Sequence, residues 1–442
     1  MGNYIPSTPA QQQKMLDCIG ISSLEELYRD VPGELLYKGD SKAQPGKSLL
    51  EAQQEMSEAA SENKIFCSMF RGAGSYRHYI PPIVESTVSK ETFLTAYTPY
   101  QAEISQGILQ SIFEYQTMIC QLTGMDASNA SIYDGASAAA EAAAMCRDRK
   151  RHKALISSSA HPDVIETIKT YCWAADAEME LIPSRDGVTD LNALEAMLDD
   201  TAACVYIQQP NYFGNIEDCQ KAAEAAHGKK AKFIMGINPI AAAVLKTPGE
   251  CGADITVGEG QPLGMSTAYG GPYLGFMAAS KAMTRKLPGR IVGETHDGSG
   301  NRAFVLTLQA REQHIRREKA SSNVCSNQAL CAMTAAVYMA AMGARGIREA
   351  AVQSMSKARY LAAKLDSLGF SRIHSGEFFH EFVTSCPVDA HKLDDFLCSR
   401  GILGGLPIDD GILWCTTELN SKSDIDSLTA AIAEFTKKAV KA

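Results

Sequence analysis

The chain has 442 residues, 45% of them hydrophobic, which is enough for a sizeable core distributed over two or three domains. Its formal net charge of -9 and isoelectric point near 5.6 exclude the clustered positive charge that nucleic-acid binding requires. The 13 cysteines are scattered, with no CxxC pair and no group with histidine at zinc spacing. We therefore expect no disulfide framework, no metal site, and reduced thiols in the cytoplasm.

The N-terminal stretch MGNYIPSTPAQQQ lacks the basic start and apolar run of a secretory signal. The most apolar long segment, residues 330–344, is too short to cross a bilayer and rich in small residues. We expect it to form a buried helix and expect no membrane partner.

The first predicted region, residues 1–70, has helical character, with Ser22 and Ser23 as candidate caps. Glycine, proline and aromatic residues in FRGAGSYRHYIPPIV then indicate a boundary within 65–90. A helix is predicted from Glu103 to a glycine stop at Gly124.

Short β-rich runs alternate with helical ones from KALISSS through GFMAAS. This alternation predicts an α/β protein with a doubly wound, mostly parallel sheet, and we assign the large domain to residues 71–325. After the apolar helix near residue 330, the pattern of β-rich and helical runs changes. We assign residues 326–442 to a small α+β domain.

Gly135, Ala136 and Ser137 open a predicted helix in IYDGASAAAEAAAMC. The free N–H groups and dipole of such a helix start suit a phosphate. A glycine turn that only caps an alanine-rich helix is the commoner meaning of this spacing, and the residues alone favour it.

His161 directly follows a predicted strand, at the sheet edge where doubly wound proteins build their sites. Its imidazole would stack on a ring, shuttle a proton, or serve only as a structural hydrogen-bonding group. The sequence leaves these alternatives open.

Polar and aromatic groups gather just before the helix that follows LTAYTPYQAEISQG, namely Tyr97, Thr98, Tyr100 and Gln101. Two phenols and an amide beside a helix start suit a small polar anion. A rigid linker whose rings merely pack fits the same residues.

Several basic residues crowd into REQHIRREK: Arg311, His314, Arg316, Arg317 and Lys319. They cannot all face one side of a helix, so part of the set is expected to be solvated surface. The functional interpretation is a patch that docks an acidic partner, with Arg316 or Arg317 turned toward an interface carboxylate.

Several long motifs, in order along the chain, resemble one family: FRGAGSYRHYIPPIV, YTPYQAEISQG, FEYQTMICQLTGMDASNASIYDGASAAAEA, GADITVGEGQPLG, AYGGPYLGFMA and REQHIRREKASSNVCSNQAL. They resemble the glycine cleavage system P-protein, or glycine decarboxylase, and within it the first, or alpha, subunit of the two-subunit form. The resemblance implies the type I pyridoxal-phosphate (PLP) fold of the aspartate aminotransferase class. It also implies that the complex decarboxylates glycine and passes the aminomethyl group to the lipoyl arm of the H-protein, releasing carbon dioxide.

The chain departs from PLP enzymes at the position of the reactive lysine. In GADITVGEGQPLG the comparable position is Pro262, and no lysine occurs from Thr247 through Ser280. The acid that these enzymes place on the pyridine nitrogen is also missing, because Phe233 to Pro248 contains no carboxylate. Catalysis by this chain alone is therefore not expected.

The resemblance implies that PLP is carried by the beta subunit, with none bound covalently here. Tyr97, Thr98, Tyr100 and Gln101 are then the candidates for reaching the beta subunit's glycine pocket. Degenerate cofactor positions are expected at Gly135, Ala136, Ser137 and His161, and docking of the beta subunit or H-protein at Arg311, His314, Arg316 and Arg317. Two alternatives stay open: a self-sufficient PLP enzyme using Lys246 or Lys281, and a purely structural or docking partner.

Overall fold

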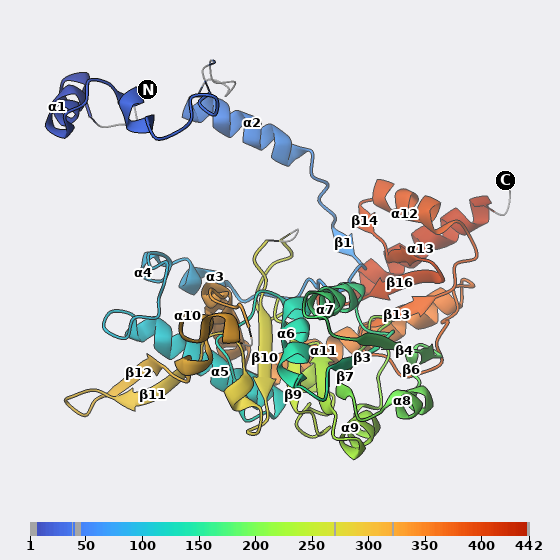
Figure 1. Cartoon of the computed structure of the whole chain (residues 1–442). Coiled ribbons are helices and arrows are strands. Elements are labelled where there is room, and N and C mark those ends of the chain that lie inside the picture. The colour runs from blue at the N-terminus through green and yellow to red at the C-terminus, as the bar shows by residue number, and fades with distance from the viewer. Residues whose placement is uncertain (1–6, 38, 40–45, 269–270, 321, 440–442) are drawn as a thin grey trace. The chain divides into compact units, whose positions relative to one another are not determined.

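The structure, a computed structural model, describes residues 7–37, 39, 46–268, 271–320 and 322–439. The chain divides into two compact units, Met1–Ile65 and Phe66–Ala442, which can be followed by colour in Figure 1. The second unit begins with β1 (Ser68–Met69), which pairs in parallel with β14 (Ile402–Leu403). The predicted division near residue 325 stays a prediction.

The first unit contains two capped helices, as its helical composition predicts. α1 (Pro9–Ile19) and α2 (Leu49–Ser61) begin at Thr8 and Ser48, and each start is a capping box completed by the glutamine or glutamate three residues later. A 3₁₀ turn at Leu24–Tyr28 lies between them. Of the two predicted caps, Ser23 precedes this turn without a side-chain cap hydrogen bond, and the hydroxyl of Ser22 donates to Glu26.

The core of the second unit is a seven-stranded sheet in the order β2-β10-β9-β8-β7-β3-β4. The mostly parallel sheet predicted from the sequence is confirmed, and β10 alone runs antiparallel to its neighbours. The strands are β2 (Ala127–Ser128), β3 (Lys153–Ser157), β4 (Met179–Ile182), β7 (Ala202–Gln209), β8 (Lys232–Ile237), β9 (Ile255–Glu259) and β10 (Gly275–Ala279).

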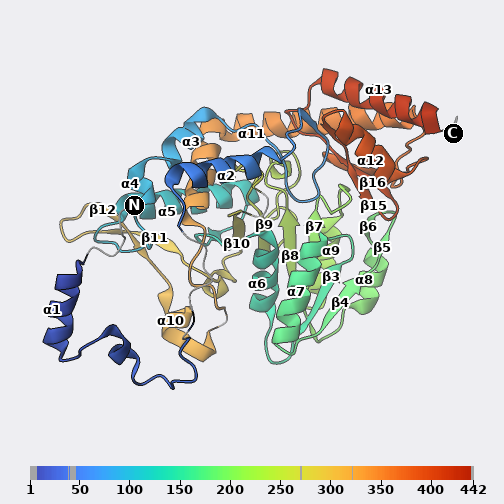
Figure 2. The ribbon, with the colours of Figure 1, turned by 90° about the horizontal axis from the view of Figure 1, so that it is seen from above.

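Helices cover both faces of this sheet, because successive strand residues point to opposite faces and both sets are apolar. Leu155 and Val205 pack toward one cluster, whereas their neighbours Ile156 and Cys204 pack toward the other. The second cluster includes α6 (Gly135–Cys146) and α7 (Pro162–Ala174), which lie side by side in Figure 2. The first includes α5 (Gln106–Thr123), α8 (Leu191–Met197) and α9 (Cys219–Gly228).

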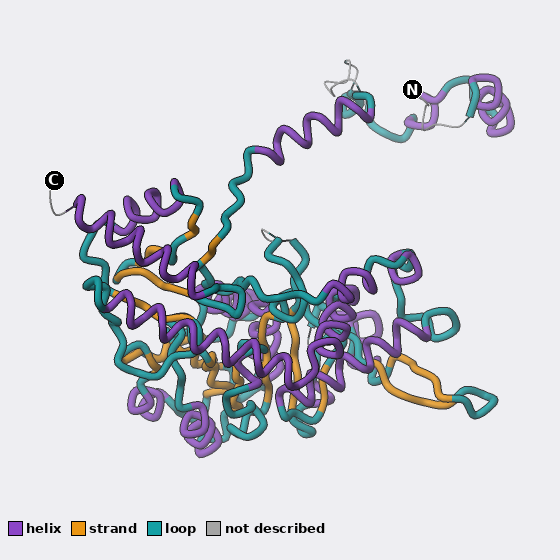
Figure 3. The backbone as a smooth tube through the Cα atoms, turned by 180° about the vertical axis from the view of Figure 1, so that it is seen from behind, coloured by secondary structure: helices purple, strands orange, loops and turns teal. Residues whose placement is uncertain are grey.

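Several short elements lie outside this sheet, and Figure 3 shows a two-stranded hairpin, in orange, that projects away from the body of the second unit. The helix predicted from Glu103 is α5, which begins at Gln106 and ends at Thr123. The predicted stop, Gly124, follows with a left-handed φ of 68°. The other elements before the long helix are α3 (Pro82–Val88), α4 (Glu91–Leu94), α10 (Gln313–Arg316), the β5–β6 hairpin (Ser184–Arg185 with Val188–Thr189) and the β11–β12 hairpin (Val292–His296 with Arg302–Leu306).

One long helix, α11 (Ala329–Asp366), links the large sheet to a C-terminal layer. Its first half packs on the sheet cluster, and its last turns pack against α12 (Ala390–Ser399) and α13 (Lys422–Ala439). Gly343, with φ 60° and ψ 175°, interrupts the helical conformation between these halves. A three-stranded antiparallel sheet completes the layer: β13 (Glu381–Thr384), β16 (Gly411–Cys415) and β15 (Leu406–Ile408).

The apolar segment predicted to be a buried helix lies in this first half of α11, where residues such as Ala332, Ala335 and Tyr338 are fully buried. By length and composition alone α11 is also apolar enough to cross a membrane, although half of its most apolar window is buried against the protein. That degree of burial fits a core helix.

Candidate functional site

A cavity of about 620 Å³ opens at the edge of the sheet where the parallel strands end. Its walls include residues at the carboxyl ends of four strands: Gln208 and Glu259 are among the last residues of β7 (Ala202–Gln209) and β9 (Ile255–Glu259), and His161 and Asn238 follow β3 and β8. The start of α6, the segment 73–76 and the first residues of β13 close it from other sides. This is the position at which doubly wound proteins bind ligands.

A carboxylate occupies the N-terminus of α6. The helix begins at Gly135 because the Asp134 side chain accepts a hydrogen bond from the N–H of Ser137 at 2.7 Å. Glu259 then accepts the Gly135 N–H at 2.9 Å, together with the N–H groups of Gln261 at 2.9 Å and Leu274 at 3.1 Å. The helix start predicted to suit a phosphate is thus satisfied by the chain's own side chain.

Burial dominates the electrostatics of this carboxyl group. It raises the pKa of Glu259 to about 7, although the three backbone N–H donors act in the opposite direction. A Cβ added to Gly135 would lie 2.8 Å from the backbone nitrogen of Glu259, so only glycine permits this close approach. Strand β9 and helix α6 are consequently locked together at the cavity.

No lysine or arginine lines this cavity among the described residues. Pro262 does line it, as expected for the residue at the lysine position. Lys246 is exposed and its Nζ donates to Gln220 at 3.1 Å. Lys281 follows β10, whose last residue pairs with the first residue of β9, so it lies at the opposite edge of the sheet. Neither lysine is placed to serve as a displaced reactive group.

An amide is the first polar side chain after β8, the strand from which the resemblance expects the pyridine acid. Asn238 accepts the N–H groups of Ile240 and Ala241 through Oδ1, at 2.9 and 3.2 Å. Its buried Nδ2 has no hydrogen-bond partner within the part of the chain that the structure describes. The residue lines the cavity with a fixed orientation and an unused donor.

The C-terminal layer contributes a second buried carboxyl group. Glu381 accepts the N–H of Ala73 and the hydroxyl of Tyr76, both at 2.7 Å, and burial raises the pKa of Glu381 to about 7. Beside it, His380 is 1% exposed and its ring lies 4.7 Å from that of Tyr76. Burial lowers the pKa of His380 well below its usual range, so the ring is neutral.

His161 is held by hydrogen bonds at both ring nitrogens. Nδ1 accepts the N–H of Asp163 at 3.1 Å and thereby caps α7, so Nε2 carries the proton and donates to the carbonyl of Ala73 at 2.9 Å. The ring also meets Tyr212 edge-on, with centroids 5.2 Å apart. Of the alternatives left open by the sequence, this geometry favours the structural hydrogen-bonding role.

The YTPYQ residues lie outside this cavity. Tyr97 is 94% exposed, and Thr98 and Gln101 are exposed as well. Tyr100 is half-buried, its hydroxyl donates to Asn327, and burial raises its pKa to about 12. The motif therefore divides into one anchored phenol and a set of side chains open to solvent.

Arg290 links the basic segment, residues 311–319, to Tyr100. It pairs with Glu312 of that segment, and its guanidinium lies 5.7 Å from the centre of the Tyr100 ring. Arg290 forms a buried ion pair with Glu312, and His314 lies 3.8 Å from that carboxylate. Arg290, Glu312, His314 and Arg317 line a second cavity of about 430 Å³. Two motifs that were separate in the sequence are thus brought together.

The other basic residues differ in their exposure. Arg311 is partly buried, donates to the carbonyl of Gly289 at 2.8 Å, and has its pKa lowered by burial. Arg316 and Arg317 are exposed, and neither forms an ion pair within the described part of the chain. Of the five basic residues, Arg311 is therefore structural, whereas His314, Arg316, Arg317 and Lys319 are exposed.

Sequence reasoning identified Gly135, Ala136, His161 and Pro262, which all line the first cavity. It missed Asn238, Glu259, Tyr76 and Glu381, which also line it. The available signal was a polar residue at the end of a buried strand, which Glu259 is, or directly after one, which Asn238 is. Among the residues described, no group of three or more potential ligands is arranged to hold a metal ion.

The strand order, the covering helices and a cavity beyond the strand ends define the chain as a protein of the type I PLP-dependent fold. Its structure is similar to sphingosine-1-phosphate lyase of Burkholderia pseudomallei, with a TM-score of 0.67 at 14% identity over 93% of this chain and 95% of the other. At this identity the likeness concerns the fold alone.

Residues 2–432 match the sequence profile of the glycine cleavage system P-protein family, and the chain belongs to that family. It is 46% identical over 444 residues to "Probable glycine dehydrogenase (decarboxylating) subunit 1" of Desulfitobacterium hafniense, covering 98% of this chain and 100% of the relative. A relative of the same name from Bacillus cytotoxicus is 47% identical, over 96% and 97%. The inhibitor-bound crystal structure of glycine decarboxylase (P-protein) is similar with a TM-score of 0.91 and 39% identity, over 98% and 100%.

The cavity of this chain does not fit PLP. It offers no lysine for covalent attachment and no lysine or arginine for the phosphate among the described residues. The α6 N-terminus, where a phosphate would bind, is filled by the Glu259 carboxylate. The site keeps the architecture of its fold class without the groups that hold this cofactor.

Proposed function

We propose that this chain is the alpha subunit of a two-subunit glycine decarboxylase of the glycine cleavage system. With its beta subunit it decarboxylates glycine on PLP and transfers the aminomethyl group to the lipoyl arm of the H-protein, releasing carbon dioxide. The observation that carries the proposal is the end-to-end similarity to proteins named subunit 1, at 46% identity over 98% of the chain.

The cofactor belongs to the beta subunit in this proposal, within a heteromeric complex of the cytoplasm. A cavity with Pro262 at the lysine position and Glu259 on the α6 N-terminus supports this division of labour. When bound, PLP supplies the electron sink that decarboxylation requires. This chain then contributes structure and surface side chains, and it is inactive alone.

Tyr97, Thr98 and Gln101 are the side chains of this chain that reach the glycine pocket of the beta subunit. Their exposure supports this role, because type I PLP enzymes complete each site with loops from a neighbouring subunit. Tyr100 anchors the segment through Asn327 and the Arg290 guanidinium. Hydroxyl and amide donors at this position bind and orient the glycine carboxylate.

Docking of the lipoylated H-protein involves the exposed cations His314, Arg316 and Arg317. Reversing charge at Arg316 and Arg317 raises the KM for H-protein and leaves kcat at saturation unchanged, as expected for a rim contact. The matched control is Lys169→Glu on α7, an exposed lysine outside this patch. Equal KM values for both variants contradict this docking surface.

The direct test compares the visible absorption spectrum of the purified chain with PLP, alone and with the beta subunit, while glycine-dependent carbon dioxide exchange is assayed. We expect the band of lysine-bound cofactor and activity only in the mixture. A band in the chain alone, with a reduced adduct on Lys246 or Lys281 after borohydride treatment, supports the self-sufficient enzyme instead. A purely structural role predicts full exchange activity after replacement of Tyr97.

A further inference from the structure

Segment 94–104, which contains the YTPYQ motif, is attached to the body of the chain mainly through one residue. Tyr97 is 94% exposed, and most of the other residues of the segment are exposed as well. Pro99 is buried and Tyr100 is half-buried. Within the described residues, the Tyr100 hydroxyl donates the one side-chain hydrogen bond of this segment, to Asn327. The position of Tyr100 therefore determines where the exposed side chains lie.

The Tyr100 ring has a charged neighbour on a rigid part of the fold. The Arg290 guanidinium lies 5.7 Å from the ring centre, within the range of a cation–π contact. The Arg290 carbonyl accepts the N–H of Ala130 at 2.8 Å. Two residues later β11 begins at Val292, whose N–H and carbonyl bond to the Gln116 side chain of α5 at 3.0 and 2.9 Å. The backbone at Arg290 is thus fixed on both sides.

Glu312 fixes the other end of the Arg290 side chain. An arginine has several rotatable bonds, so a fixed backbone alone leaves the guanidinium free to move. Glu312 Oε2 accepts a hydrogen bond from Nη1 of Arg290, and the glutamate side chain is only 3% exposed. The Glu312 backbone is held as well, because its N–H donates to the Gln309 carbonyl at 2.9 Å. Separating this pair would leave a charge unpaired and away from water, so the guanidinium stays in place.

We propose that Glu312 is a positioning residue for the glycine site of the complex. Its carboxylate holds the Arg290 guanidinium beside the Tyr100 ring, and Tyr100 in turn fixes the exposed side chains of segment 94–104. This inference rests on the proposed function, in which Tyr97 and its neighbours bind the glycine carboxylate. Glu312 itself does not touch the substrate, and it acts through the position of the segment.

Glycine-dependent carbon dioxide exchange by the complex, at saturating H-protein, tests this role. Glu312→Gln keeps the shape of the side chain and removes the charge that orients the guanidinium. We expect the KM for glycine to rise about fivefold or more, with a smaller change in kcat, because a misplaced segment weakens substrate binding. The matched control is Glu318→Gln, which removes the same charge from an exposed side chain of the same basic segment and should leave this KM unchanged.

Combination with Tyr97→Phe distinguishes positioning from a general structural effect. Since Glu312 acts through the segment that carries Tyr97, Glu312→Gln should raise the KM for glycine by a smaller factor in the Tyr97→Phe background than in the wild type. Equal factors in the two backgrounds, or no rise in the wild type, overturn the inference. A wild-type mixture of subunits without exchange activity refutes the proposed function, and this inference with it.

Amide hydrogen exchange of the folded chain measures the order of the segment without the beta subunit. The N–H groups of Tyr100, Ile104 and Ser105 donate to carbonyls of the segment at 2.9, 3.2 and 2.9 Å. These amides should exchange about threefold or more faster in Glu312→Gln than in Glu318→Gln, because the anchored ring becomes mobile. Equal exchange rates in the two variants reject the positioning role.

A second variant covers the case in which Glu312→Gln does not fold because the Arg290 charge is left unpaired. The double variant Arg290→Met with Glu312→Gln removes both charges and leaves no unpaired buried ion. It also takes the guanidinium away from Tyr100, so the same rise in the KM for glycine and the same faster exchange are expected. A folded double variant with the wild-type KM for glycine overturns the inference.

Discussion

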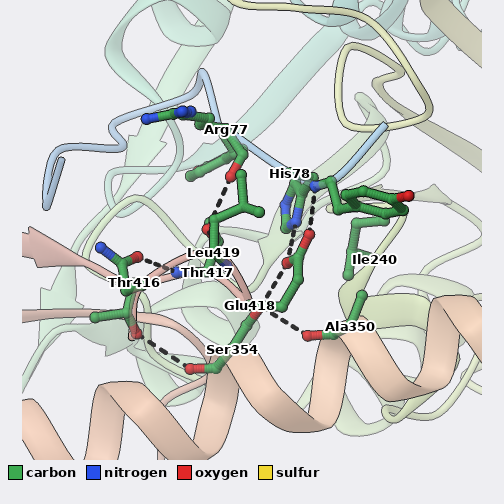
Figure 4. Close-up of polar contacts among 12 residues, drawn as sticks. Arg77, His78, Ile240, Ala350, Ser354, Thr416, Thr417, Glu418 and Leu419 are labelled. Carbon is green, nitrogen blue, oxygen red and sulfur yellow. Dashed lines mark hydrogen bonds and ion pairs between the residues drawn. The ribbon is translucent and has the colours of Figure 1, made fainter. Parts of the chain in front are cut away.

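His78 and Glu418, which are 340 positions apart in the sequence, form a buried pair with Nδ1 and Oε2 separated by 2.7 Å. Their side chains are 1% and 11% exposed. The other carboxylate oxygen accepts the N–H of Tyr79 at 2.6 Å, and Ser354 of α11 contacts the carboxylate at 3.4 Å. Figure 4 shows this network, which connects the segment leading into α3, the loop before α13 and α11.

Replacing Glu418 by glutamine should lower the free energy of unfolding by about 1–3 kcal/mol near neutral pH, because His78 and Tyr79 lose a charged acceptor. Burial raises the pKa of Glu418, but hydrogen bonds from His78 and Tyr79 outweigh it and the net pKa is lowered. The stabilisation is therefore present above the unfolded carboxyl pKa and is lost as pH falls through the folded value. Urea unfolding of wild type and variant at neutral and acid pH measures it.

The control for this pair is Glu195→Gln, an exposed carboxyl on α8. Its unfolding curves should follow those of the wild type within about 0.5 kcal/mol at every pH. If Glu418→Gln retains the acid destabilisation of the wild type in full, the pair with His78 is not its source.

Glu259→Gln should change the pH dependence of stability in the opposite direction. The folded pKa of Glu259 is raised to about 7, so its favourable contribution is complete below the unfolded pKa and declines as pH rises through about 7. Between about pH 5 and 8 the wild type should lose about 2–3 kcal/mol more than the variant, from the size of the pKa change. Chemical denaturation of both proteins over that pH range tests this prediction. Free energies of unfolding that change equally with pH in the two proteins contradict it.

Tyr97→Phe should leave the chain's stability within about 0.5 kcal/mol of wild type, because the side chain is 94% exposed. In the complex, glycine-dependent carbon dioxide exchange should fall by about tenfold or more if the hydroxyl orients the substrate. Tyr100→Phe is the matched comparison, since its hydroxyl donates within this chain to Asn327. It should cost about 1 kcal/mol of stability. Unchanged exchange activity in Tyr97→Phe removes that residue from the site.

Gly343→Ala should destabilise the chain by about 1–3 kcal/mol, because φ 60° and ψ 175° lie in a region that only glycine occupies readily. No neighbouring atom lies within 4 Å of an added Cβ, so backbone strain is the whole effect. Gly107→Ala in α5, where an added Cβ also meets no atom within 4 Å and φ is not left-handed, is the control and should be neutral or slightly stabilising. Thermal unfolding compares the two, and equal melting temperatures contradict the strain argument.

Local patterns in the sequence were sufficient for most of the fold. The alternation of β-rich runs predicted β3, β4, β7, β8, β9 and β10. All of these strands except β4 are almost continuously buried, as expected for strands covered on both faces. The alternation did not predict β2, because a two-residue strand carries no periodic signal. The strand order and the antiparallel direction of β10 depend on contacts between distant segments, which periodicity does not report.

The candidate site was only partly predictable for the same reason. Pro262 and the glycine at the start of α6 were recognisable from their motifs. The hydrogen bond from the Gly135 N–H to Glu259 joins residues 124 positions apart. Neither motif reveals that the Glu259 carboxyl is buried, which is what raises its pKa. Likewise, the exposed Tyr97 and the anchored Tyr100 are almost adjacent in the sequence, so only their surroundings distinguish them.

The cap that Glu259 provides for α6 has a consequence for how the protein is made. A helix N-terminus capped by a bound phosphate receives that stabilisation only from the ligand, and the stabilisation grows with the logarithm of the ligand concentration. In this chain the capping group is the Glu259 carboxyl, which is part of the polypeptide and is present as soon as the chain is synthesised. The start of α6 is therefore capped in this chain whether or not vitamin B6 is available.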